Sequence, residues 1–362
     1  MTVTLLIGAA TKDHIAFEVS PIAELGAVLH LMTDPSHHAP LSEIGRYFRS
    51  QLHDDVLHEL DVLSPLWTGY RCRIFFPLRL EPSASIADDL DRIENLDEAR
   101  LVEVIIWGIV GGHSRAPSIQ SIRASNGERE IMERARARSE SAYTLARELF
   151  INPDRVRQRV TDLISRLVAS LGNEWSRSQA ILRADIHVRR RIVDRDGLIP
   201  ALTGLTHSSR LLLDPDRVAI DKIHHGVIDC EKKTLLALPS RYGWPHLLVK
   251  QEPGWPPLIH YPLEPTATVR GNPASRVVQQ RLTALSDATR LKVCRLLARE
   301  RLTTTELARI TNVSIPQMSR TLRQLRECSL VIQTRRGHFV FYHLDIEAIK
   351  HLGSDLLVSL IR

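Results

Sequence analysis

Hydrogen-bonding side chains follow one face of a predicted helix over residues 314–328. With helical spacing, Met318, Leu322 and Leu325 share the side that faces a core. The opposite side carries Gln317, Arg320, Thr321 and Gln324, with Ser314 and Ser319 near the helix start. Arginine pairs with O6 and N7 of guanine and glutamine with N6 and N7 of adenine, and a good bidentate contact adds about 1–3 kcal/mol of discrimination. This side is therefore predicted to contact base edges, whereas Arg323 and Arg326, further round the helix, are expected to contact phosphates.

Two capping signals position this helix. Thr303 and Glu306 have the spacing of a capping box, in which each side chain binds a backbone N–H at the helix start. The same spacing recurs eleven residues later in Ser314 and Gln317. Two capped helices joined by the short turn 311–313 predict a helix-turn-helix, whose second helix enters the major groove of DNA.

A basic hairpin is predicted to follow the second helix. The runs Leu330–Thr334 and Phe339–Leu344 alternate in polarity, as antiparallel strands do. Between them lie Arg335, Arg336, Gly337 and His338. We expect Arg335, Arg336 and His338 at the tip of this wing, within reach of the DNA backbone or minor groove.

Positive charge is concentrated in the same part of the chain. Residues 274–362 contain 15 Lys and Arg against 7 Asp and Glu, a net charge of +8, whereas the first 273 residues contain 33 against 35. Such asymmetry is typical of a domain that binds a polyphosphate.

These motifs carry a family resemblance. The order LSDATRLKVCRLL, TTTELARI, SIPQMSRTLRQLRECSLV and then a basic hairpin resembles an ArsR/SmtB-type winged helix-turn-helix regulator over about residues 273–352. The resemblance implies a DNA-binding transcriptional repressor whose terminal helices form a homodimer. Apolar stripes in 274–285 and 346–360 exceed the needs of one small domain, so we expect a homodimer on a palindromic operator.

The chain departs from the family at its metal sites. The paired cysteines of the family's thiolate site have no counterpart at Thr305–Ile310, and Asp345, Glu347 and His351 do not match its C-terminal-helix site. We therefore expect neither a metal site nor a cofactor. Ser329 also stands where glycine usually ends the reading helix, so a left-handed cap there would be strained.

The remaining residues predict a separate N-terminal domain. We expect a mainly α protein with small β content: a helical α+β domain with a small antiparallel sheet over residues 1–265, a linker at 266–272 and a winged helix-turn-helix domain at 273–362. This N-terminal region is similar to one of unassigned function that is found fused to such regulators. The aromatic-rich segment Pro65–Arg79 favours core over a ligand pocket. His37 and His38 form a tempting ligand pair, but no cysteine or carboxylate lies at ligand spacing, which favours a solvated loop.

Three roles remain open for residues 1–265: a small-molecule effector or dimer-supporting module, an enzyme, or a scaffold that senses nothing. GxSxG, HExxH and P-loop motifs are absent, which disfavours the enzyme. Four cysteines without a CxxC pair and the lack of an apolar run near the roughly 18 residues of a membrane span indicate a cytoplasmic protein. The sequence therefore predicts a sequence-specific transcriptional regulator.

Overall fold

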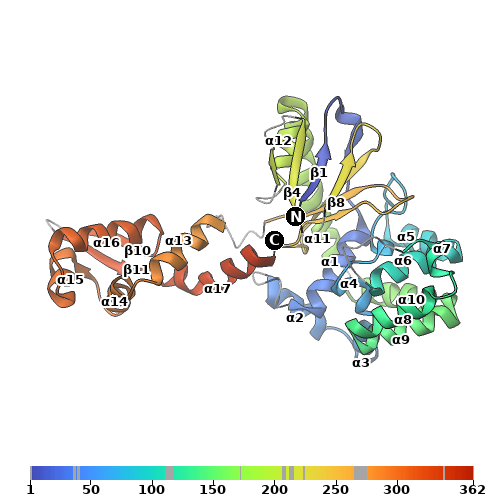
Figure 1. Cartoon of the computed structure of the whole chain (residues 1–362), viewed down its shortest axis with the longest axis horizontal. Helices are drawn as coiled ribbons and strands as arrows, with labels where there is room; N and C mark the ends of the chain where they lie inside the picture. The colour runs from blue at the N-terminus through green and yellow to red at the C-terminus, as the bar shows by residue number, and fades with distance from the viewer. Residues whose placement is uncertain are drawn as a thin grey trace. The chain divides into compact units, whose positions relative to one another are not determined.

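A computed structural model describes residues 2–35, 38, 41–110, 117–171, 173–205, 209–211, 216–222, 225–264, 275–336 and 339–361. The chain divides into two compact units, Met1–Thr266 and Ala267–Ile361 (Figure 1). The predicted linker at 266–272 lies outside the described residues. No helix in the described ranges is long and apolar enough to cross a lipid bilayer.

Helices make up most of the N-terminal unit, as the predicted fold class requires. They are η1 (Lys12–His14), α1 (Pro21–Thr33), α2 (Ser42–Ser50), α3 (Asp54–Leu63), α4 (Pro65–Thr68), η3 (Arg73–Phe75), α5 (Ile86–Glu94), α6 (Glu98–Val110), α7 (Ile119–Ile122), α8 (Gly127–Arg138), α9 (Glu140–Ile151), α10 (Pro153–Leu171), α11 (Asn173–Asp196) and α12 (Leu198–Thr203). Helix α1 begins with Ser20 as N-cap, whose Oγ accepts a hydrogen bond from the Ala23 N–H, and with proline at its first position.

Two four-stranded sheets complete this unit. Their strands are β1 (Thr2–Leu6), β2 (Ile15–Phe17), β3 (Ser209–Leu211), β4 (Arg217–Asp221), β5 (Gly226–Asp229), β6 (Leu235–Ser240), β7 (Leu248–Lys250) and β8 (Leu258–Pro262). The strand orders are β3-β4-β1-β5 and β2-β6-β8-β7. The predicted antiparallel pairing is present in β1–β4, β3–β4 and β7–β8, and parallel pairs β1–β5, β2–β6 and β6–β8 accompany it.

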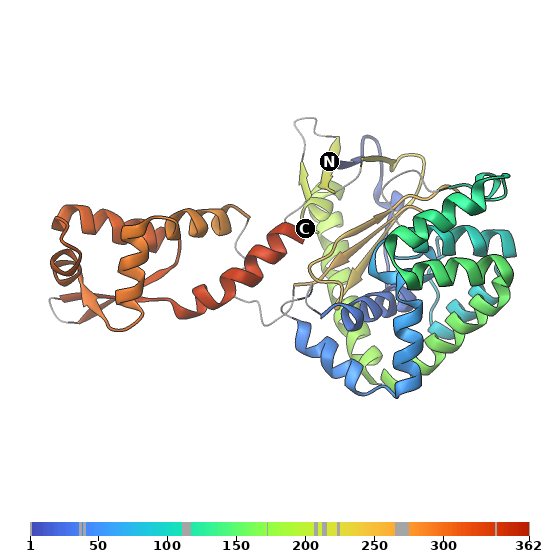
Figure 2. The same cartoon turned by 60° about the horizontal axis from the view of Figure 1, so that its bottom comes forward.

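The second sheet is covered on both faces (Figure 2). Every residue of β6 is buried, as expected of a strand with helices on both sides. Leu235 and Ala237 pack into one core cluster with side chains of α11 and α12. Leu236 and Leu238 point the other way and pack with Ala23 of α1. This alternation follows from the two-residue period of a strand.

A buried ionic cluster lies beside this sheet. Glu252 accepts a hydrogen bond of 2.7 Å from the Tyr70 hydroxyl and contacts both Arg73 and Lys250 at 3.3 Å. Burial lowers the pKa of Lys250 to about 8, although the Glu252 carboxylate opposes the shift. In the same segment Trp67, Phe75 and Phe76 are fully buried, so the core interpretation of Pro65–Arg79 is confirmed.

The C-terminal unit is a winged helix-turn-helix. It contains α13 (Ser275–Leu285), α14 (Ala288–Leu297), β9 (Leu302–Thr303), α15 (Thr304–Thr311), α16 (Ile315–Glu327), β10 (Val331–Arg336), β11 (Phe339–Leu344) and α17 (Ile346–Ile361). Its sheet has the order β10-β11-β9. The predicted fold class is thus confirmed for both parts of the chain.

Candidate DNA-binding interface

The first capping box forms as predicted. The Glu306 carboxylate accepts a 2.7 Å hydrogen bond from the Thr303 N–H, and the Glu306 N–H donates to Thr303 Oγ1 at 3.3 Å. The hydrogen bonds from Thr303 lower the pKa of Glu306. Helix α15 ends at Thr311, and its C-cap Asn312 has a left-handed conformation (φ 57°) that lets the chain turn into α16. Asparagine tolerates this conformation better than most residues.

At the start of helix α16, only one of the two hydrogen bonds of the second predicted capping box is present among the described residues. Ser314 Oγ accepts a 3.4 Å hydrogen bond from the Gln317 N–H, and Pro316 occupies the first turn. Among the described hydrogen bonds, the reciprocal one from the Ser314 N–H to the Gln317 side chain is absent. The Gln317 amide group therefore keeps its hydrogen-bonding capacity.

One side of α16 is anchored in the core. Met318, Leu322 and Leu325 are buried, as predicted, in a cluster with residues of α14 and α15. Burial of each such side chain stabilises the fold by about 1.5–3 kcal/mol. With that side fixed, the opposite side of the helix must face solvent.

The exposed side carries the predicted contact residues. Thr321 is half-buried, and the exposed members are Ser314, Gln317, Ser319, Arg320, Arg323, Gln324 and Arg326. Within the described part of the chain, the side chains of Arg320 and Arg323 make no hydrogen bond or ion pair. Two cations that no carboxylate neutralises suit binding to an anionic partner.

Two of the predicted residues are held by side chains of the same unit. The Gln324 amide oxygen accepts a 3.0 Å hydrogen bond from Arg290, which also donates to the Thr283 and Ala284 carbonyls. Arg326 donates to the Gln333 side chain on β10. Arg290 thus ties the end of α13 to α16 and orients the exposed face.

The wing differs in detail from its prediction. Strand β10 continues through Arg336, so Arg335 and Arg336 pair with Val340 and Phe339 instead of lying in the turn. Backbone hydrogen bonding extends the hairpin by two residues beyond the alternating apolar pattern, which ends at Thr334. Arg335 is exposed, and His338 lies outside the described residues.

Ile315 is a surface residue that sequence reasoning missed. It directly follows the Ser314 cap and is 53% exposed. An apolar side chain there can contact the methyl group of thymine. Its position directly after the helix cap could have predicted this exposure from the sequence. Ser329, just past α16, has φ 54°, as anticipated for a left-handed cap without glycine.

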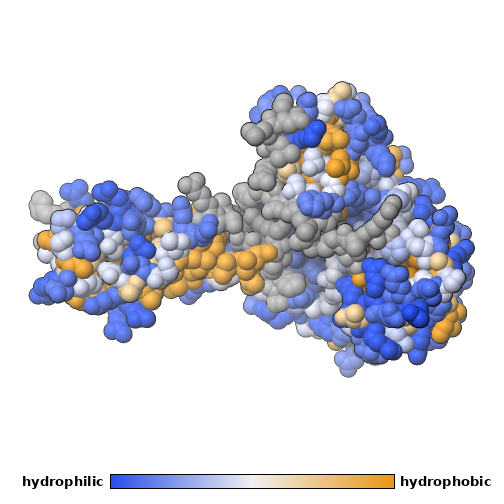
Figure 3. All heavy atoms as spheres, in the orientation of Figure 1, coloured by the Kyte–Doolittle hydropathy of each residue, from blue (hydrophilic) through white to orange (hydrophobic). Residues whose placement is uncertain are grey.

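Exposed apolar side chains gather on the two terminal helices of this unit. Arg281 on α13 pairs with Asp355 on α17 at 3.1 Å, which fixes the two helices against each other. Leu282, Ile346, Leu357 and Leu360 remain exposed. Figure 3 shows hydrophobic side chains along α17.

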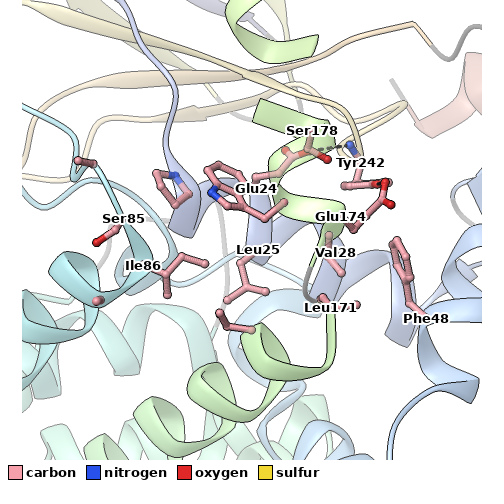
Figure 4. Close-up of a pocket in the computed structure, with 15 residues that line it drawn as sticks. Glu24, Leu25, Val28, Phe48, Ser85, Ile86, Leu171, Glu174, Ser178 and Tyr242 are labelled. Atoms are coloured by element: carbon pink, nitrogen blue, oxygen red, sulfur yellow. Dashed lines mark hydrogen bonds between the residues drawn. The ribbon is translucent and has the colours of Figure 1, made fainter. Parts of the chain in front are cut away.

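The N-terminal unit contains a cavity of about 310 Å³ between α1 and α11. We call it the α1–α11 cavity. Its lining includes the apolar residues Leu25, Val28 and Leu171, and Figure 4 shows Glu24, Glu174, Ser178 and Tyr242 above them in the view. Apolar walls with a few convergent polar groups are typical of small-molecule sites.

The polar end of this cavity is built around Glu24. Burial raises the pKa of Glu24 to about 7, against the lowering effect of hydrogen bonds. Its Oε1 accepts from the backbone N–H groups of Arg241 and Tyr242 at 2.9 and 3.3 Å. The Tyr242 hydroxyl and the Arg241 guanidinium both donate to Glu174.

His38 does not lie in a solvated loop, contrary to the prediction. Its side chain is fully buried and meets His30 of α1 and His246 of the 241–247 loop. His37 lies outside the described residues. The prediction failed because it searched for ligand spacing along the chain, whereas His246 approaches from more than 200 residues away.

Parts of the chain match known protein families and individual proteins. Residues 1–267 match a family of unknown function, DUF5937, and residues 285–334 match a helix-turn-helix domain. The arsenic resistance transcriptional regulator ArsR1 of Pseudomonas putida is 41% identical over 64 residues, which cover 17% of this chain and 50% of that protein. The chain thus spans half the length of this curated relative. NolR from Sinorhizobium fredii, whose crystal structure covers 26% of this chain and 90% of its own, is 24% identical with a TM-score of 0.21.

The two family matches cover the two structural units in turn. The helix-turn-helix match spans α15 and α16 and ends within β10. The other match covers almost three quarters of the chain. The chain therefore belongs to the DUF5937 family of unknown function, and its residues 285–334 match a helix-turn-helix domain.

Proposed function

We propose that this protein is a sequence-specific transcriptional repressor that places α16 in the major groove of a palindromic operator as a homodimer. The observation that carries the proposal is the division of α16 into a buried apolar side and an exposed side rich in arginine and glutamine. Gln317 and Arg320 act as base readers. Arg323, Arg335 and Arg336 contact phosphates, which set the register on the duplex.

Binding to a selected operator tests this proposal. An operator is first selected from random duplex DNA with the full chain, and affinity is then measured by fluorescence anisotropy. We expect Arg320→Ala to weaken binding by about 5- to 150-fold, the equivalent of about 1–3 kcal/mol, and to relax selectivity at one base pair. Arg129→Ala is the matched control, since it removes the same charge from an exposed position on α8. Equal affinities for Arg320→Ala and the parent protein would contradict base reading by α16.

The exposed apolar residues of α13 and α17 support the homodimer. Leu357 and Leu360 are 45% and 73% exposed on the terminal helix. Covering them with a second copy removes apolar surface from water at about 25 cal/mol per Å². We expect a dimer in sedimentation velocity at micromolar concentration and a monomer for the Leu357→Asp, Leu360→Asp double variant. A monomeric parent protein would refute the dimer.

The α1–α11 cavity supports control by a small molecule. Its apolar wall and the Glu24 and Glu174 carboxyl groups suit an apolar molecule that carries an amine or hydroxyl donor. A ligand that binds only the folded state raises the melting temperature. We expect hits from a panel of aliphatic and aromatic amines, and we expect the Val28→Trp variant, which fills the cavity, to lose them.

The cysteines of the N-terminal unit do not favour the enzyme alternative. Cys72 and Cys230 are buried, and burial raises the pKa of each thiol to about 12. Cys72 donates a 3.0 Å hydrogen bond to the Val104 carbonyl. A protonated, buried thiol is a poor nucleophile.

A further inference from the structure

Three histidine side chains converge at one end of α1. His30 lies in the last turns of α1, His38 follows the helix, and His246 belongs to the loop between β6 and β7. The ring centroids are 5.0 Å apart for His30 and His38, 5.1 Å for His30 and His246, and 5.0 Å for His38 and His246. The rings are inclined to one another by 64–79°. The rings thus form a nearly equilateral triangle, with each edge-on to the next.

Each histidine offers one ring nitrogen as a possible metal ligand. The three nitrogens lie within 4.8 Å of one another. His30 and His38 are buried and His246 is half-buried. Water therefore has limited access to the triangle.

A second interaction fixes the tautomer of His38. Its Nδ1 is hydrogen-bonded to the Trp244 carbonyl oxygen. Because a carbonyl oxygen only accepts, Nδ1 carries a proton, and in the neutral ring Nε2 then has the lone pair that a metal needs. A hydrogen bond from the remote nitrogen to a backbone carbonyl is the usual support of a metal-bound histidine.

We propose that His30, His38 and His246 form a three-histidine site for a divalent transition metal of the Zn²⁺ class. Neutral imidazole suits zinc, cobalt, nickel and copper, whereas magnesium and calcium need oxygen ligands. Zinc–nitrogen bonds of about 2.0–2.1 Å in a tetrahedron place the nitrogens about 3.3 Å apart. Movements of about an ångström in the side chains therefore close the triangle on the ion.

The ligand count leaves one coordination position for a fourth donor. Three protein ligands with an open fourth position distinguish reactive or exchangeable zinc sites from closed structural ones. The ion would join the end of α1 to the 241–247 loop, which is more than 200 residues away in the sequence. All three ligands belong to the N-terminal unit, so metal uptake can be measured without DNA.

Cobalt binding tests the site in the full-length protein. The protein is purified without a polyhistidine tag, stripped with a chelator and titrated with CoCl₂, whose visible absorption reports tetrahedral coordination. We expect one Co²⁺ per chain, displaced by Zn²⁺. His38→Gln and His246→Gln should each weaken binding by at least about 100-fold, since even loss of a supporting hydrogen bond costs 10–100-fold. His58→Gln, which alters an exposed histidine on α3, should leave binding unchanged.

If a glutamine variant fails to fold, a cysteine in place of one histidine still tests the site. His246→Cys retains a donor atom, and a thiolate bound to Co²⁺ adds a near-ultraviolet charge-transfer band. We expect this band in His246→Cys and not in a His58→Cys control. A parent protein that takes up no Co²⁺ would overturn the proposal and identify a hydrogen-bonded histidine cluster without a metal. Unchanged cobalt spectra in all three cluster variants would overturn it as well.

Discussion

Replacing Glu24 by glutamine should change how the stability of the N-terminal unit depends on pH. The Glu24 carboxyl group is fully buried beside the α1–α11 cavity, and this burial raises its pKa from 4.5 to about 7. Glutamine keeps an oxygen that accepts from the Arg241 and Tyr242 N–H groups, but it has no proton to lose. The substitution therefore removes the titration and preserves most of the contacts.

The sign follows from proton binding in the two states. Between pH 4.5 and pH 7, folded Glu24 holds a proton that the unfolded chain has released, so its contribution to stability falls as pH rises. The contribution is complete below pH 4.5 and is lost above pH 7. With these two pKa values, the loss between pH 5 and pH 8 is about 2.5 kcal/mol. Relative to the parent protein, Glu24→Gln should therefore gain about 2.5 kcal/mol of stability over that range.

Tryptophan fluorescence isolates the relevant unfolding transition. All five tryptophans, at positions 67, 107, 175, 244 and 255, lie in the N-terminal unit. Urea unfolding at pH 5, 6, 7 and 8 then yields the free energy of unfolding for each protein. Burial also raises the pKa of Asp89 to about 6, but Asp89 is present in both proteins, so its contribution cancels in the difference between them. If the free energies of unfolding of the parent and Glu24→Gln change in parallel with pH, Glu24 is not a buried carboxyl group that holds its proton. Glu133→Gln, which alters an exposed residue on α8, is the control.

Three substitutions test interactions within each unit, two in the C-terminal unit and one in the N-terminal unit. Ser329→Gly should raise the free energy of unfolding of the C-terminal unit by about 0.5–1 kcal/mol, because glycine adopts φ 54° without strain; a lower melting temperature by circular dichroism would contradict this. Thr303→Ala should cost about 1 kcal/mol by removing the capping box, and no change in helix-end hydrogen exchange would count against the cap. Glu252→Ala leaves Arg73 and Lys250 buried without their carboxylate and should cost about 3–5 kcal/mol in urea unfolding, whereas a loss under 1 kcal/mol would mean that water enters the cluster.

Local rules were sufficient to predict the helix-turn-helix. The Thr303–Glu306 box acts over three residues, and the buried side of α16 follows from spacings of three and four. Such contacts lie within one or two helical turns, so the chain order alone specifies them. The strained cap at Ser329 was predicted from the family resemblance instead, because glycine usually ends the reading helix at that position.

Tertiary packing limited the accuracy of finer predictions in the same unit. Helical spacing from Cys294 would place Ala298 on the inner face of α14, yet Ala298 is exposed and Val293 is fully buried instead. Helix α14 ends at Leu297, so the periodicity that placed Ala298 inside no longer applies. The short strand β9 was also missed, because two residues pair with β11 only once the hairpin exists.

The α1–α11 cavity and the three-histidine cluster could not be predicted from spacing along the sequence. Both include residues of α1 and of the 241–247 loop. Glu24 and His30 both lie on α1, while their partners Tyr242 and His246 both lie in the 241–247 loop. Glu24 meets Arg241 across 217 residues, and His38 meets Trp244 across 206. Motif searches measure spacing within a few turns, whereas these contacts arise because sheet β2-β6-β8-β7 brings the loop after β6 back against α1. A ligand at either site must therefore act on the same pair of segments, so any change that moves the loop should be visible at both.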